Sequence, residues 1–206
     1  MSNIKQHWND IFDNTQTEDL GWFDAENSQI KDFISRGCWL REDAKIFFAG
    51  AGTSSLVKDL SAQKRQLVIN DISSIALERL KIELKASKSS CHWICQDVSR
   101  PISEQFGNLD LWIDRAVLHF LHDESDIQGY FDNLTGLLKP GGYALFAEFS
   151  KQGAAKCAGL PINRYDLAML QQRLPEFSLV EHDEFLFTSR TGLERPYIIA
   201  LFQKPA

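Results

Sequence analysis

The residues best suited to bind a ligand come directly after four short apolar runs. The first run ends in Gly50-Ala51-Gly52, the second in Asp71, the third in Asp97-Val98 and the fourth in Asp114-Arg115. Glycines let a backbone approach a ligand closely, a following helix offers free N–H groups, and carboxylates accept hydrogen bonds from hydroxyls and amines. The pattern predicts one ligand site built from the ends of several segments.

The spacing of these residues suggests which parts of a ligand they would bind. Asp71 follows Gly52 by 19 residues, a separation at which an acidic side chain can accept both hydroxyls of a ribose. Asp97 can accept from an exocyclic amine while the N–H of Val98 donates to a ring nitrogen. A plain turn at the glycines, a helix cap at Asp71, a surface turn at Asp97 and a structural ion pair between Asp114 and Arg115 are the alternatives. Together the four ends favour a nucleoside pocket.

A second group of reactive side chains follows the fourth and fifth runs. His119 and His122 lie where a second substrate would sit, and a histidine that titrates near neutrality can take a proton from an amine, hydroxyl or thiol. We expect His119 to be the candidate catalytic base, although its apolar surroundings in AVLHFL also fit a structural role. Cys157, Arg164 and Tyr165 are predicted to line the same substrate cavity, with packing or surface roles as alternatives.

The N-terminal segment is rich in aromatic residues that need packing partners. They are Trp8, Phe12, Trp22, Phe23 and Trp39. We predict a single domain in which residues 1–40 form a helical lid over a core of residues 41–206. Trp22 is the candidate aromatic for contact with a cationic ligand group and with the substrate, and plain packing is its alternative.

The elements that would position these residues alternate between strand and helix. Predicted strands are 45–49, 67–71, 92–96, 109–114 and 142–149, and predicted helices are 54–60, 73–86, 125–138 and 165–174. Such alternation predicts right-handed crossovers and a parallel sheet. Two later runs, 177–188 and 196–203, predict an antiparallel hairpin at one edge. We therefore expect an α/β, Rossmann-like fold with a seven-stranded, mostly parallel sheet, helices on both faces, and an N-terminal helical addition.

The overall composition excludes several classes of protein. Of 206 residues, 44% are hydrophobic, which excludes a disordered chain, and the net charge is −6. A phosphate-binding domain would be basic, so neither nucleic acid nor an anionic membrane is an expected partner. No apolar stretch has the length of a signal peptide core or a membrane span. We expect a cytoplasmic protein.

The cysteines fit the same expectation. The four are Cys38, Cys91, Cys95 and Cys157. Cys91 and Cys95 lie close together with His92 between them, but no second Cys/His pair has zinc-site spacing. We expect reduced structural thiols and no metal, with a metal or metalloid site as the alternative.

Several strings of the chain occur in the order found in one enzyme family. They are FFAGAGTS, LVINDIS, WICQDV, LWIDRAVLHFL and LLKPGGYALFAEF. From Lys45 to Phe149 the chain resembles the class I S-adenosylmethionine-dependent methyltransferases. It is most similar to small bacterial members with an HW…W[YF] N-terminus and with DRAVxHFL and CxGLPxxRY segments, here Asp114–Leu121 and Cys157–Tyr165. Its N-terminal aromatics also resemble those of thiopurine methyltransferases.

The resemblance implies a cofactor, S-adenosylmethionine, and assigns its contacts. It implies Gly50, Ala51 and Gly52 at the methionine and ribose, Asp71 and Ile72 at the ribose, Asp97 and Val98 at the adenine, and Asp114 and Arg115 at the amino-acid end. The chain departs from the family pattern at two positions. Phe48 stands where the family usually has an acidic residue, and Ser54 replaces a third glycine.

The resemblance implies in-line methyl transfer, for which the protein mainly aligns donor and acceptor in a dry site. We expect a small-molecule acceptor, and a protein side chain remains an alternative. A non-catalytic binding or regulatory protein of the same fold is a second alternative. A nicotinamide-dependent oxidoreductase is a third, which the incomplete glycine pattern disfavours.

Overall fold

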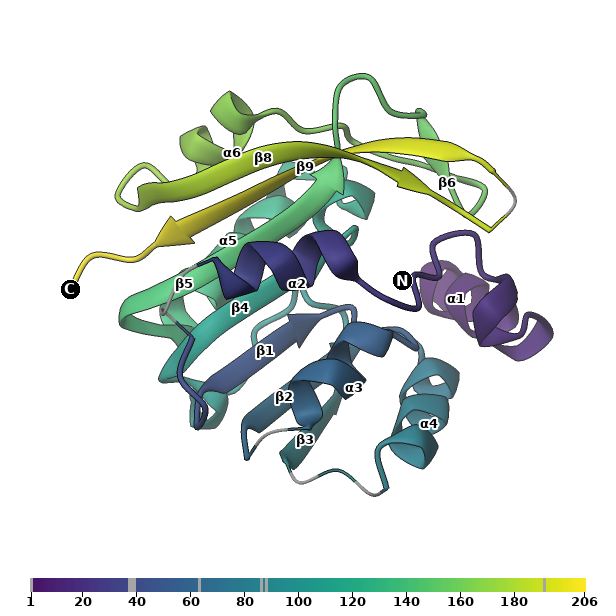
Figure 1. Ribbon diagram of the computed structural model, residues 1–206, viewed down its shortest axis with the longest axis horizontal. Helices are drawn as coiled ribbons and strands as arrows, with labels where there is room; N and C mark the ends of the chain where they lie inside the picture. The colour runs from purple at the N-terminus through teal and green to yellow at the C-terminus, as the bar shows by residue number, and fades with distance from the viewer. Residues whose placement is uncertain (1, 37–39, 63, 86, 88, 191) are drawn as a thin grey trace.

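Figure 1 shows the computed structural model of the protein, which describes residues 2–36, 40–62, 64–85, 87, 89–190 and 192–206. The predictions made for Cys38 and Trp39 lie outside these residues. No helix in the described ranges is both long and apolar enough to cross a membrane.

A seven-stranded sheet forms the centre of the fold, in the order β3-β2-β1-β4-β5-β9-β8. Its strands are β1 (Lys45–Ala49), β2 (Gln66–Asp71), β3 (Ser90–Cys95), β4 (Leu109–Arg115), β5 (Leu138–Phe149), β8 (Ser178–Thr188) and β9 (Glu194–Gln203). The first five are parallel, and β9 is antiparallel to both β5 and β8. The predicted mostly parallel sheet with a C-terminal hairpin at one edge is confirmed.

Helices cover both faces of the sheet. They are α1 (Ser2–Asn14), α2 (Ser28–Ser35), α3 (Ser55–Ser61), α4 (Ser74–Glu83), α5 (Glu124–Leu137) and α6 (Leu167–Arg173). Because strand side chains alternate, Ile46 and Phe48 of β1 face the core shared with α2, α3 and α4, while Phe47 faces the core shared with α5 and α6. Figure 1 shows α2 crossing the near face and α5 lying behind the sheet.

Side-chain caps explain where several helices begin. Ser73 caps α4, and its hydroxyl accepts from the Ala76 N–H at 3.2 Å. Asp166 caps α6 by accepting from the Met169 N–H at 2.9 Å, so this helix begins later than the predicted residue 165. The strand β5 begins at Leu138, earlier than predicted, because Leu138 pairs with Leu109 of β4; residues 139–142 then bulge out before the pairing resumes between Leu111 and Tyr143.

The N-terminal segment has two structural parts. Residues 4–24, here called the N-terminal cover, include most of α1 and lie at the end of the sheet toward which the β1 arrow points in Figure 1. The helix α2 instead contributes Ile30 and Phe33, which are 2% and 1% exposed, to the core of the sheet. Only the cover therefore has the position expected of a lid.

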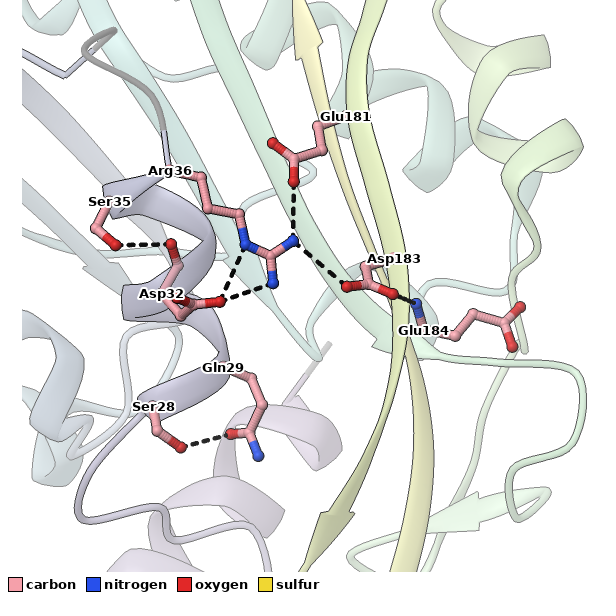
Figure 2. A network of polar contacts seen from close by, with 8 residues as sticks. All are labelled: Ser28, Gln29, Asp32, Ser35, Arg36, Glu181, Asp183 and Glu184. Atoms are coloured by element: carbon pink, nitrogen blue, oxygen red, sulfur yellow. Dashed lines mark hydrogen bonds and ion pairs between the residues drawn. The ribbon is translucent and has the colours of Figure 1, made fainter.

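An ion-pair network joins α2 to the edge strand β8 (Figure 2). The Arg36 guanidinium donates to Asp32 at 2.7 Å, to Glu181 at 2.9 Å and to Asp183 at 3.4 Å. The two strand carboxylates together with the helix carboxylate hold the pKa of Arg36 above its ordinary value. The network links the N-terminal addition to the C-terminal hairpin at the surface.

The two remaining strands form a small separate hairpin after β5. They are β6 (Lys156–Cys157) and β7 (Leu160–Pro161). Two histidines from other parts of the chain contact it: the Nε2 atom of His7 lies 3.1 Å from the Ala158 carbonyl oxygen, and that of His122 lies 3.1 Å from the Pro161 carbonyl oxygen. The hairpin is therefore held next to both α1 and the segment that follows β4.

Candidate functional site

A cavity of about 350 Å³ lies at the carboxyl ends of β1, β2 and β4 and beside the turn after β3. Strand-end turns form one wall, and the N-terminal cover forms the opposite wall. The residues of the strand-end wall include Phe48, Gly50–Ser55, Asn70–Ile72, Gln96–Val98, Ile113 and Arg115–Val117. Ligands of open α/β sheets bind at this end of the strands, where the strand order reverses, as it does here between β1 and β4.

The turn after β1 is shaped by two glycines in the left-handed region. Gly50 has φ +56°, and a Cβ atom there would lie 2.3 Å from Cγ2 of Val117. Gly52 has φ +55°, and a Cβ atom there would lie 3.3 Å from the Phe12 ring of α1. Both positions favour glycine for their conformation, and Gly50 also has no space for a Cβ atom; both residues line the cavity.

Asp71 at the end of β2 fixes this turn from the neighbouring strand. Its Oδ2 accepts from the Gly52 N–H and its Oδ1 from the Ser73 N–H, each at 2.7 Å. Burial raises the pKa of Asp71 to about 6, and the backbone donors oppose that shift. Each carboxylate oxygen has a second lone pair, so the group can also accept from a ligand hydroxyl.

The turn after β3 brings Asp97 and Val98 to the cavity wall. One carboxylate oxygen of Asp97 accepts from the Ser99 N–H at 2.9 Å and from the Ser99 hydroxyl at 2.7 Å. The Val98 carbonyl accepts from the side chain of Asn133 at 2.8 Å, which fixes the turn against α5. The predicted adenine contacts therefore lie along one wall with Asp71 and the glycine turn.

Aromatic rings form much of the N-terminal cover. The Trp8 ring makes edge contacts with Trp22 and Phe120, with centroid distances of 5.8 and 5.0 Å, and Phe12 also contacts Trp22 at 6.3 Å. All four line the cavity. Trp22 is thus brought to the predicted place, and its contact with a cofactor or substrate stays a prediction.

An ion pair joins the cover to the end of β4. The Arg115 guanidinium donates to the Trp22 carbonyl at 3.0 Å and lies 3.8 Å from Oδ2 of Asp24. Both charged side chains are mostly buried, with exposed fractions of 16% and 15%, and both line the cavity. Sequence reasoning selected Arg115 but missed Asp24, whose only signal is its place directly after Trp22-Phe23.

His119 is not placed as predicted. It is 0% exposed, does not line the cavity, and has Nδ1 2.9 Å from Oε2 of the equally buried Glu148. Burial lowers the pKa of His119 to about 3 and raises that of Glu148 to about 8. A histidine with no access to the cavity cannot take a proton from a substrate there, so the prediction of His119 as the catalytic base is wrong in this structure.

Asp114 is also buried behind the wall rather than exposed to the cavity. Its carboxylate accepts from the N–H groups of Val117 and Leu118 at 2.9 and 3.0 Å, and from the Tyr130 hydroxyl at 2.7 Å. Burial and the nearby Glu148 raise the pKa of Asp114 well above its ordinary value. Asp114 therefore shapes the turn that carries Arg115, and direct contact with the cofactor does not fit its position.

Of the three predicted residues after β5, one reaches the cavity. Cys157 lines it and is 6% exposed, and burial raises the pKa of its thiol. Arg164 is exposed and donates to the carbonyls of Lys151 and Gly153 at 3.2 and 3.3 Å. Tyr165 packs in the core beside α6 at 3% exposure. Neither of these two lines the cavity, because the chain turns away after the β6–β7 hairpin.

His122 lines the cavity where His119 does not. Its Nε2 lies 3.1 Å from the Pro161 carbonyl oxygen, which can only accept, so this nitrogen carries the hydrogen. In the neutral ring Nδ1 is then the basic nitrogen.

In the part of the chain that the structure describes, no group of three His, Cys, Asp or Glu residues could hold a metal, and Cys91, Cys95 and Cys157 are free.

Residues 49–144 match a family described as a methyltransferase domain. A search of curated proteins finds no match to the chain. Among solved structures, a SAM-dependent methyltransferase from Anabaena variabilis ATCC 29413 has 18% sequence identity and a TM-score of 0.79, over 98% of this chain and 93% of that one.

Two further structures have bound ligands. The N-methyltransferase NodS from Bradyrhizobium japonicum WM9, in complex with S-adenosyl-L-homocysteine, has 17% identity and a TM-score of 0.70 over 97% of this chain and 100% of that one. A 1,6-didemethyltoxoflavin-N1-methyltransferase from Burkholderia thailandensis, with bound 1,6-didemethyltoxoflavin and S-adenosylhomocysteine, has 16% identity and a TM-score of 0.63 over 88% of this chain and 84% of that one. These likenesses show the fold, which is the Rossmann-like fold of SAM-dependent methyltransferases. Together with the domain match they support a methyltransferase with S-adenosylmethionine as its cofactor.

Proposed function

We propose that the protein transfers a methyl group from S-adenosylmethionine to a small-molecule acceptor. The observation that carries this proposal is the cavity at the strand ends, where the glycine turn, Asp71 and the Asp97-Val98 turn follow one another along a wall. Its volume of about 350 Å³ lies within the range of ligand pockets, roughly 300–1,000 Å³.

The residues on this wall fit an adenosyl cofactor. The exposed backbone at Gly50 and Gly52 allows close approach of the methionine and ribose, and Asp71 accepts from the ribose hydroxyls. The Val98 N–H and the Asp97 carboxylate fit the edge of an adenine ring. When bound, the cofactor supplies an activated methyl group on a sulfonium.

The chain's own residues then align the acceptor and exclude water from it. The N-terminal cover closes the cavity with apolar rings, which excludes water and favours a positively charged group near an aromatic face. Cys157 and His122 are the cysteine and the histidine among the described residues that line the same cavity. We assign His122 Nδ1 as the proton acceptor, in place of the buried His119.

The proposal extends to partners and to the subgroup. The cover forms one wall of the cavity and narrows it, which favours a small molecule over a protein side chain, and the net charge of −6 argues against nucleic acid. The similarity of Asp114–Leu121 and Cys157–Tyr165 to the small bacterial subgroup supports membership in it. We also propose a cytoplasmic location, which the free thiols favour.

Calorimetry with S-adenosylmethionine and S-adenosylhomocysteine tests the cofactor assignment, and we expect both to bind with one site per chain. Binding of neither compound would contradict the proposal. Binding with no turnover across a panel of amine, hydroxyl and thiol acceptors would favour a binding protein instead.

Once an acceptor is found, His122→Gln should lower kcat by about 100-fold or more and leave the S-adenosylhomocysteine Kd unchanged. The matched control is His182→Gln on β8, a histidine that does not line the cavity. An unchanged kcat in His122→Gln would remove this histidine from the chemistry.

A further inference from the structure

The cavity is lined by both partners of an ion pair, Arg115 and Asp24. Arg115 is the only lysine or arginine among the described residues that line the cavity, and Asp24 is the carboxylate beside it. The other lining carboxylates are engaged elsewhere or exposed: Asp71 and Asp97 accept from backbone N–H groups, Asp126 lies 3.0 Å from Arg100, and Asp123 is exposed.

The pair leaves hydrogen-bonding capacity on both partners. The separation of 3.8 Å between Arg115 Nη2 and Asp24 Oδ2 is longer than a hydrogen bond. Oδ1 of Asp24 accepts from the backbone N–H groups of Glu26 and Asn27 at 3.2 and 2.8 Å, which fixes the carboxylate and leaves Oδ2 directed to the arginine. Arg115 uses one of its N–H groups on the Trp22 carbonyl and has four others.

Asp24 lies beside the turn after β1, although it belongs to a different part of the chain. The Ser55 hydroxyl donates to the Asp24 carbonyl, and the Asn27 side chain donates to the same hydroxyl at 2.7 Å. Ser55 is the first residue of α3, three residues after Gly52. The carboxylate is thus held at the end of the cavity where the exposed glycine backbone lies.

We propose that Asp24 and Arg115 bind the α-amino acid end of the cofactor, with the ammonium on Asp24 and the carboxylate on Arg115. This proposal rests on the proposed function and identifies a carboxylate from the N-terminal cover as part of the cofactor site. The amino-acid end of the cofactor carries both charges. Its carboxylate could accept from the free N–H groups of Arg115, and its ammonium could donate to Oδ2 of Asp24. The charges are mostly buried, so their effect on binding is larger than that of an exposed pair.

The position of Asp24 also supplies a carboxylate that the strand-end wall lacks at Phe48. Phe48 is 4% exposed, lines the cavity and supplies no charge there. Asp24 brings a carboxylate into the same cavity from the opposite wall. Cofactor binding then becomes coupled to the position of the N-terminal cover.

The test compares two ligands that differ only in the α-amino group: S-adenosylhomocysteine and its deaminated analogue. The wild-type protein should prefer S-adenosylhomocysteine by about 10- to 100-fold in Kd, as expected for a hydrogen bond between charged groups. In Asp24→Asn this preference should fall to about one, while the Kd of the deaminated analogue stays the same or decreases. The matched control is Glu26→Gln, an exposed carboxylate on the same segment that does not line the cavity.

The outcomes separate this proposal from the proposed function. A wild-type preference that persists in Asp24→Asn overturns the assignment of Asp24 and leaves the cofactor assignment intact. Equal weakening of both ligands in Asp24→Asn also overturns it, because it shows a structural role. Failure of the wild-type protein to bind either ligand overturns both proposals.

Discussion

The two walls of the cavity are held in different ways. On the strand-end wall, side-chain carboxylates bind backbone N–H groups: Asp71 holds the turns after β1 and β2, and Asp114 holds the turn after β4. The N-terminal cover is held by ring contacts of Trp8 and by side chains outside it that donate to its backbone carbonyls, as Arg115 does to Trp22 and Arg79 does to Thr15. The first wall is a surface of backbone turns, whereas the second is mainly a surface of side-chain rings. The difference indicates that most of the proposed cofactor contacts belong to the first wall, and that the second covers the cavity and adds the proposed contact of Asp24.

The largest expected effect is on the strand-end wall. Gly50→Ala adds a Cβ atom 2.3 Å from Val117 at φ +56°, so it should reduce the free energy of unfolding by about 2–4 kcal/mol. Urea denaturation measures the change. Gly136→Ala in α5 is the control, because its added Cβ meets no atom within 4 Å, and it should stabilise the protein by about 0.5–1 kcal/mol. Equal effects at the two glycines would contradict a rigid wall.

Asp71→Asn should weaken S-adenosylhomocysteine binding by about 10- to 100-fold, since a buried acceptor for the ribose is replaced. The wild-type affinity should also fall as the pH drops below about 6, the pKa of Asp71. Affinity falls on acidification because protonation removes a lone-pair acceptor from the Asp71 carboxylate. Calorimetry between pH 8 and 5 checks both results. A pH dependence that persists in Asp71→Asn, or that disappears in the exposed control Asp43→Asn, would assign the titration to another group.

A change in the cover should have a smaller effect. Trp8→Leu removes edge contacts with Trp22 and Phe120 and should weaken S-adenosylhomocysteine binding by about 3- to 10-fold, since such ring pairs contribute about 0.5–1.5 kcal/mol. Limited proteolysis should cleave residues 4–24 faster in this variant. The control Trp93→Leu on β3 lies outside the cavity and should leave the affinity unchanged. A larger loss than in Asp71→Asn would reverse the proposed roles of the two walls.

The smallest effect is expected at the surface network of Figure 2. Arg36→Gln breaks the ion pairs of α2 with Glu181 and Asp183, which are exposed and screened by salt. The Tm should decrease slightly at low salt and match that of the wild type at high salt. A salt-independent decrease would point to lost packing of Arg36 on Phe33, which lies 5.5 Å away.

The sequence predicted the strand-end wall well and the cover poorly, for a physical reason. Apolar runs followed by glycine or aspartate report local structure, so β1 was predicted at its observed bounds and Asp71 at its observed place. Which side of a turn a residue faces depends on tertiary packing. For that reason His119 and Asp114 were assigned to the cavity although both face the core, and Asp24 was missed because its partners are 31 and 91 residues further along the chain.

The Rossmann-like part of the chain should not be expected to survive removal of its first 36 residues. Truncation before β1 would uncover the sheet face on which Ile30 and Phe33 lie, and it would leave the carboxylates of β8 without Arg36. Shortened versions prepared for crystallisation should therefore retain α2, and affinity tags are better attached at the exposed C-terminal residue Ala206.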